Sequence, residues 1–195
     1  MAGKTPPALS IAAALLFQGG IGVVGLIGVW LLAIPLKTAG LPVLQAIGWG
    51  MLGAGATYLT LLGFSSIPGL VPDDLKRQMQ GLYRFARRYP GWVLVLLSVL
   101  AGVGEELLFR GAIQGGLERY TGPWLAIVIA SMLFGLAHCI SITYFLIATG
   151  LGVLLGVVYV ISDSLALVMV WHAVYDMLAL YCLLRYPHWF GLEPR

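Results

Sequence analysis

Apolar residues fall into six long runs along this chain, with short polar stretches between them. Each run approaches or exceeds the ~20 residues that an α-helix needs to cross the hydrocarbon core of a bilayer. The runs cover residues 8–35, 41–64, 91–118, 123–140, 143–161 and 164–184. The pattern predicts an all-α fold, a polytopic membrane helix bundle with about six transmembrane helices. Between the fourth and fifth runs, only Ser141 and Thr143 mark the turn.

One longer polar stretch, residues 65–90, interrupts these runs. Pro72 and Asp73 are typical of a helix start, and apolar residues then recur at helical spacing. The basic residues between them are Lys76, Arg77, Arg84, Arg87 and Arg88. We predict one amphipathic interfacial helix with its basic side towards anionic headgroups. A plain basic loop is the alternative.

The composition agrees with a membrane protein and limits its partners. Of the 195 residues, 60% are hydrophobic and only 10% are charged, whereas a soluble domain has about 25% charged residues. The net charge of +3 requires no nucleic acid as a partner, because basic residues near membrane ends set helix orientation. The predicted partner at this stage is the lipid bilayer, and the sequence predicts no oligomeric state.

Two neighbouring carboxylates, Glu105 and Glu106, lie in the third apolar run. An ionisable side chain at membrane depth costs several kcal/mol, so each needs a partner or a function. Arg110 follows Glu106 at i, i+4 spacing and can pair with it on a helix. Adjacent helical residues point about 100° apart, so one Arg cannot readily serve both carboxylates. The pattern predicts a supporting pair, Glu106–Arg110, and leaves Glu105 without a structural partner.

Two further polar clusters follow, with His138 on the fourth run and His172 and Asp176 at i, i+4 spacing on the sixth. Taken singly, a histidine in an apolar helix is more often a satisfied core residue. Glu105 precedes the turn near residues 121–122 by about 16 residues and His138 follows it by about 16. An antiparallel hairpin therefore brings both to one depth, and the sixth run reaches it within a turn or two. The clusters predict a shared polar cavity.

The residues suggest hydrolysis with a carboxylate base, since peptide hydrolysis needs an activated water and donors for the oxyanion. His138 can orient the water or protonate the leaving amine. His172 and Asp176 share a face from which to donate to the oxyanion, Asp176 only when protonated. The small Gly102 and Gly104 before Glu105 are expected to leave room for an extended peptide.

No cofactor is expected at this site, and a divalent metal is the alternative. Glu and His are competent Zn²⁺ ligands, but without a His-Glu-x-x-His motif the ligands must come from three helices. In the metal-free case we expect the side chains ~4–7 Å apart, a spacing suited to a bridging water.

The patterns Glu-Glu-x-x-x-Arg, Phe-x-x-x-His and His-x-x-x-Asp, in this order on membrane helices, resemble one family. The chain resembles the CPBP family of CAAX proteases and bacteriocin-processing enzymes, also called Abi proteins, over about residues 90–184. The resemblance implies an intramembrane endopeptidase of glutamic type, in which Glu105 activates water. The assisting motif residues are His138, His172 and Asp176. The family, long described as metalloproteases, usually has Asn and less often Asp at the last position.

The predicted function is cleavage of a peptide or protein substrate near the membrane. The family suggests prenylated C-termini, peptide leaders or C-terminal anchors, and nothing in the chain distinguishes them. One alternative is a catalytically idle immunity or scaffold protein, against which the intact motifs argue. Another is a proton-coupled transporter, which inverted repeats would favour, and we find none.

We predict a single membrane domain over residues 1–195. It comprises a glycine-rich two-helix packing scaffold (1–64), the basic interfacial connection (65–90) and a four-helix catalytic core (91–184). With the N-terminus inside and six crossings, eight basic residues fall on the inner side and three on the outer side. This excess predicts that both termini are cytoplasmic. We expect the cytoplasmic membrane of a prokaryote as the location.

Overall fold

The computed structural model describes residues 10–65, 67 and 72–192, which form helices and no strand. Five of these helices are long and apolar enough to cross a membrane: α1 (Ile11–Leu31), α2 (Val43–Ser65), the continuous helix Gly91–Thr121, α7 (Ile142–Ser162) and α8 (Leu165–Arg185). The predicted polytopic helix bundle is confirmed. Predictions that rest on Lys4, on Arg195, on the start of the first run and on residues 66 and 68–71 lie outside the described residues.

The fourth predicted run corresponds to α6 (Pro123–Ala137), which is apolar but has only 15 residues. The chain leaves the helix at His138 and enters α7 at Ile142, so the run predicted over 123–140 was too long. The apolar pattern continues through this turn, which explains the error. His138 consequently lies at the C-cap of α6 and not inside a helix.

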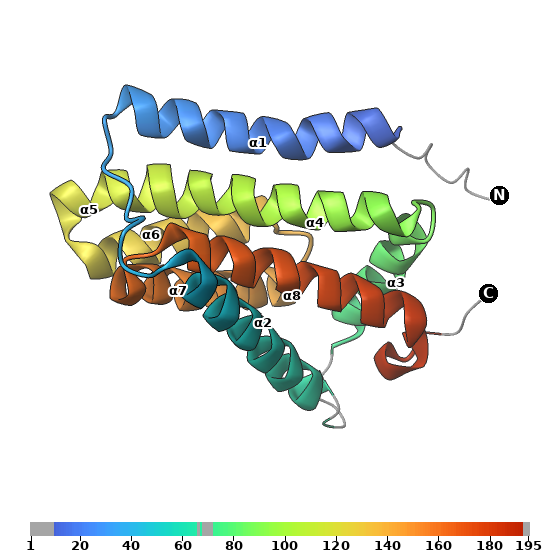
Figure 1. The fold of residues 1–195 in the computed structure, drawn as a ribbon. Helices are drawn as coiled ribbons and strands as arrows, with labels where there is room; N and C mark the ends of the chain where they lie inside the picture. Colours follow the sequence, from blue (N-terminus) through green and yellow to red (C-terminus); the bar gives the residue numbers. More distant parts are fainter. Residues whose placement is uncertain (1–9, 66, 68–71, 193–195) are drawn as a thin grey trace.

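The continuous helix Gly91–Thr121 consists of α4 (Gly91–Glu106), the π-helical segment η1 (Leu107–Gln114) and α5 (Gly115–Thr121). In Figure 1, α1 and α8 run along α4, α2 crosses obliquely, and α6 and α7 lie behind. The start of α1 and the end of α8 lie at the same end of the bundle (Figure 1). The π-helical segment begins directly after Glu106, and such segments frequently occur at functional sites.

Glycines bring α1 and α8 close to the continuous helix. A Cβ at Gly25 of α1 would lie 2.7 Å from the backbone nitrogen of Leu108, and one at Gly104 would lie 2.9 Å from that of Gly22. A Cβ at Gly102 would lie 2.6 Å from the backbone nitrogen of Ala173 on α8. Small residues allow helix backbones to approach in lipid. Gly102 and Gly104 therefore serve helix packing, and the prediction that they leave room for a peptide was wrong.

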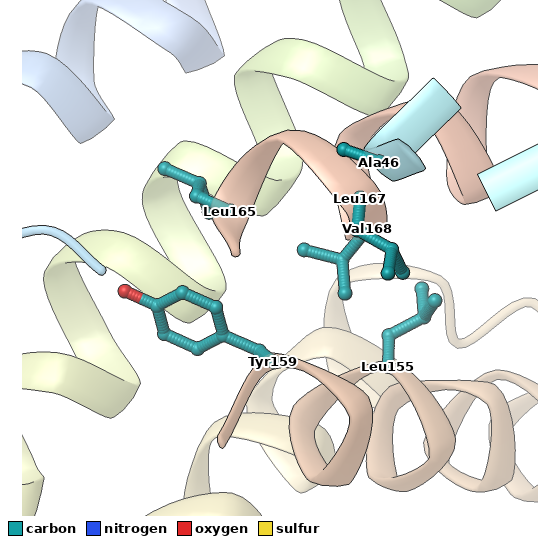
Figure 2. Packing of buried hydrophobic residues seen from close by; sticks show 6 residues of the cluster. All are labelled: Ala46, Leu155, Tyr159, Leu165, Leu167 and Val168. Carbon is teal, nitrogen blue, oxygen red and sulfur yellow. The ribbon is translucent and has the colours of Figure 1, made fainter. Parts of the chain in front are cut away.

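A buried apolar cluster joins α2, α7 and α8 behind the site. Figure 2 shows its members: Ala46, Leu155, Tyr159, Leu165, Leu167 and Val168. The hydroxyl of Tyr159 accepts a hydrogen bond of 3.2 Å from the backbone N–H of Lys37, so its polar end is satisfied. In lipid, packing contacts of this kind hold helices together, because burial from water contributes little between them.

The predicted amphipathic helix is α3 (Asp73–Ala86), and it is the one helix drawn across the end of the bundle in Figure 1. Hydrogen bonds from the hydroxyls of Ser141 and then Thr143 lower the pKa of Asp74 and connect α3 to the start of α7. At its other end, the buried Ala86 packs in a cluster with residues of α4. Both ends of α3 are thus attached to the bundle.

Candidate active site

The structure brings the three predicted clusters together at the C-terminal end of α4. Oε2 of Glu105 lies 3.5 Å from Nε2 of His138 and 3.9 Å from Nε2 of His172. The same nitrogen of His172 lies 3.7 Å from Oδ2 of Asp176. The depth argument from the two turns therefore placed these side chains correctly. They lie slightly closer together than the ~4–7 Å expected for a water-bridged cluster.

Glu106 and Arg110 form the predicted pair, with Oε2 and Nε 3.1 Å apart and neither side chain exposed. Arg110 also donates from Nη2 to the carbonyl of Gly152 at 3.2 Å. The other oxygen of Glu106, Oε1, accepts a hydrogen bond of 2.8 Å from Nδ1 of His172. Sequence analysis missed this last contact, which makes Glu106 the link between Arg110 and the histidine.

Hydrogen bonds at Nδ1 orient both imidazole rings. Nδ1 of His172 donates to the carboxylate of Glu106, and Nδ1 of His138 donates to the carbonyl of Phe134 at 2.9 Å. Carboxylate and carbonyl oxygens can only accept, so each Nδ1 carries a proton. Each Nε2 faces Glu105 and carries a lone pair in the neutral ring. Either ring can donate from Nε2 only after it takes up a second proton.

Sequence analysis also missed a contact from α1 to Glu105. Gln18 donates from Nε2 to Oε1 of Glu105 at 2.7 Å, although the two residues are 87 positions apart. Glu105 therefore has a structural partner, contrary to prediction. The available signal was Gln18 itself, the only amide side chain between Ile11 and Leu31. A polar residue inside an apolar span marks a functional site more often than a packing site.

A cavity of about 900 Å³ extends from this cluster to α3, and a volume of this size is typical of ligand sites. Glu105, His138, His172 and Asp176 line its polar end. The rest of its wall is mostly apolar and includes Leu61, Phe64, Met79, Leu82, Phe85, Leu97 and Leu180. The apolar face of α3 thus faces this cavity.

Whether this site can hold a Zn²⁺ ion depends on which of its donor atoms are grouped and free. Among the described residues, no three His, Cys, Asp or Glu are grouped so that they could hold a metal. Gln18 occupies one oxygen of Glu105, whereas Nε2 of His138 and of His172 stays free, because the hydrogen bonds of both rings are made at Nδ1. The expectation of a metal-free site stays a prediction that solution measurements must test.

An integral membrane helix bundle with glutamate, histidine and aspartate at one end of an apolar cavity has the features of a membrane-embedded hydrolase. Residues 87–178 match the family model described as type II CAAX prenyl endopeptidase Rce1-like, which is the kind of family that the three motifs resemble. The resemblance carried by the three motifs is thereby confirmed. No curated protein and no solved structure gave a significant match to the chain. The matched segment contains all seven residues of the three motifs and excludes α1, α2 and α3.

Similarity to this family supports protease activity on a peptide or protein substrate in the membrane. The motif residues that the structure gathers are carboxylates and imidazoles, the kinds of group that general acid–base catalysis uses.

Proposed function

We propose that this protein is an intramembrane endopeptidase in which Glu105 activates the water that attacks the scissile carbonyl. One observation carries the proposal: Oε2 of Glu105 has no hydrogen-bond partner and faces Nε2 of both His138 and His172. A carboxylate oxygen that is buried, unpartnered and adjacent to two ring nitrogens suits a bound water molecule. Oε2 of the structural carboxylate Glu106, in contrast, lies 3.1 Å from Nε of Arg110.

In the first step, a water at Oε2 of Glu105 gives one proton to the carboxylate while its oxygen bonds to the carbonyl carbon. The neutral ring of His138 accepts the second hydrogen of this water at Nε2 and orients it. The carbonyl becomes a tetrahedral oxyanion. Collapse of this intermediate breaks the C–N bond, and the proton held by Glu105 passes to the leaving nitrogen. Glu105 returns to its carboxylate form, so protons and electrons balance.

The oxyanion needs a donor, and two side chains on α8 are in position to supply one. His172 donates from Nε2 when its ring carries a second proton, because Nδ1 is committed to Glu106. Asp176 donates only as the carboxylic acid. Preorganised donors of this kind contribute a large share of the stabilisation in acyl transfer.

The cavity is suited to a substrate with an apolar segment next to the cleaved bond. Glu105, His138, His172 and Asp176 line it together, and most of the remaining wall is apolar, including Met79, Leu82 and Phe85 of α3. A peptide segment that leaves the bilayer can place apolar side chains along this wall and its backbone at Glu105. The sequence of the cleaved peptides has to be identified by experiment.

The test uses the full chain in liposomes that also contain a library of peptides with one apolar segment, with cleavage products identified by mass spectrometry. We expect the wild type to release defined products and the Glu105→Gln variant to release at least ~100-fold less. Glu118→Gln is the matched control, because Glu118 lies on the same continuous helix and pairs with Lys37 at 3.2 Å. Absence of cleavage by the folded wild type would overturn the proposal and favour an idle scaffold protein.

A further inference from the structure

Gln18 places an amide beside Glu105 from a helix that is otherwise apolar. Its neighbour Phe17 is 71% exposed, and most of α1 faces outwards. An amide group in such a helix carries a free-energy cost unless it finds a hydrogen-bond partner. The hydrogen-bond partner of Gln18 is Oε1 of Glu105, at the short distance of 2.7 Å from Nε2 of Gln18.

The contact between α1 and α4 holds this amide in place. Gly22 lies four residues after Gln18, on the same face of α1. It meets Gly104, the residue directly before Glu105, with a distance of only 3.2 Å from its Cβ position to the Cα of Gly104. The two backbones therefore approach closely one turn away from the amide. The backbone of α1 at Gln18 is therefore held next to Glu105.

This hydrogen bond gives the two oxygens of Glu105 different roles: one binds Gln18 and the other stays available to water. The terminal torsion of a glutamate is broad, so a free carboxylate can rotate about it. With Oε1 bound to Gln18, Oε2 is the oxygen that faces His138 and His172 and remains available to water. We infer that Gln18 is a positioning residue for the reaction: it fixes the rotation of the Glu105 carboxylate and thereby the position of the attacking water. The inference rests on the proposed function.

If Gln18 only joined two helices, its replacement would lower stability and leave kcat unchanged. Gln114 is the glutamine with which this can be compared. Gln114 also uses its amide to join two helices, donating from Nε2 to the carbonyl of Gly156 at 3.2 Å. It is fully buried and does not line the cavity. Replacing either glutamine removes one interhelical hydrogen bond. Only the replacement of Gln18 releases the catalytic carboxylate.

The experiment measures kcat and KM for a substrate peptide found in the library screen, together with thermal stability in detergent. Gln18→Met keeps the length of the side chain and removes the amide. We expect kcat to fall ~10–100-fold with KM unchanged, as for a misplaced catalytic group. Gln18→Asn is too short to reach Glu105 and should show the same fall. Gln114→Met should lower the melting temperature and leave kcat of the folded protein unchanged.

A double-mutant cycle tests whether Gln18 acts through Glu105. The Gln18→Met/Glu105→Gln protein should be no slower than Glu105→Gln alone, because the group that Gln18 positions is already inactive. Fully additive losses would overturn the inference, as would wild-type kcat in Gln18→Met. A wild type without any cleavage would overturn the proposed function and this inference together. Activity that is lost in Glu105→Gln but kept in Gln18→Met would overturn this inference alone.

Discussion

Glu105 and Glu106 are neighbours in the chain but lie in two different regions of the molecule. The open region, formed by Glu105, His138 and Asp176, lines the cavity and leaves Oε2 of Glu105 unpartnered. The sealed region, formed by Glu106 and Arg110, has no exposed side-chain surface. His172 joins the two, with Nδ1 bound to Glu106 and Nε2 near Glu105.

The difference between the open and the sealed region shows how one helix end can hold one carboxylate that water reaches and another that is shielded from water. Hydrolysis needs a carboxylate oxygen that water can reach, whereas a charge inside a membrane protein needs a partner that excludes water. Placing the carboxylates on adjacent residues turns them towards different neighbours. Substitutions in the open region should therefore affect activity, and substitutions in the sealed region should affect stability.

The largest expected effect is the loss of activity in Glu105→Gln. The substitution keeps the shape of the side chain and removes its basicity, so cleavage should fall by ~10² or more while the fold persists. Initial rates with the identified peptide and a melting curve in detergent measure both quantities. Near-normal turnover by the purified variant would contradict the role of Glu105 as the base.

The second expected effect is a loss of stability in Arg110→Ala. Removing one member of a buried ion pair leaves the other charge uncompensated, which costs ~3–5 kcal/mol. Denaturation in detergent should therefore show a larger loss than in Glu105→Gln. Arg119→Ala is a suitable control, because Arg119 lies on the same continuous helix, is exposed and caps the end of α1 through the carbonyls of Leu32 and Ala33. Equal melting temperatures for Arg110→Ala and Glu105→Gln would contradict the claim that the sealed region contributes more to stability than the open region does.

A smaller effect is expected for Asp176→Asn, which introduces the residue that the resembled family usually has at this position. An aspartate donates to the oxyanion only when protonated, whereas an asparagine amide donates at every pH. We expect less than ~10-fold change in kcat and a weaker fall of the rate as pH rises. A pH–rate profile of both proteins measures this, and identical profiles would show that Asp176 does not donate.

The smallest effect is expected from a chelator. Because no three His, Cys, Asp or Glu among the described residues are grouped so that they could hold a metal, we predict that cleavage continues after metal removal. The measurement combines elemental analysis of active protein with rates before and after a membrane-permeant chelator. Stoichiometric zinc that is lost together with activity would overturn the metal-free mechanism and make Glu105 a ligand or an assisting base.

Local patterns predicted the fold class and the convergence of the motif residues. Long apolar runs have one stable solution in lipid, a helix, and fixed rise per residue gives the depth of Glu105 and His138. The contacts of Gln18 with Glu105 and of His172 with Glu106 could not be predicted, because they depend on how helices rotate against one another. The end of α6 at Ala137 was also missed, since the apolar Cys139 and Ile140 continue the pattern beyond His138. The sidedness of the termini stays a prediction.

The short α6 has a consequence for how water reaches the site. A helix of 15 residues is about 22 Å long, whereas the hydrocarbon core is about 30 Å thick. Hydrophobic mismatch of this size is relieved by local thinning of the bilayer. Non-helical backbone at membrane depth, such as residues 138–141, is tolerated only beside protein or water. We therefore expect the aqueous interface to lie close to His138, so that water reaches the site from the end of α6.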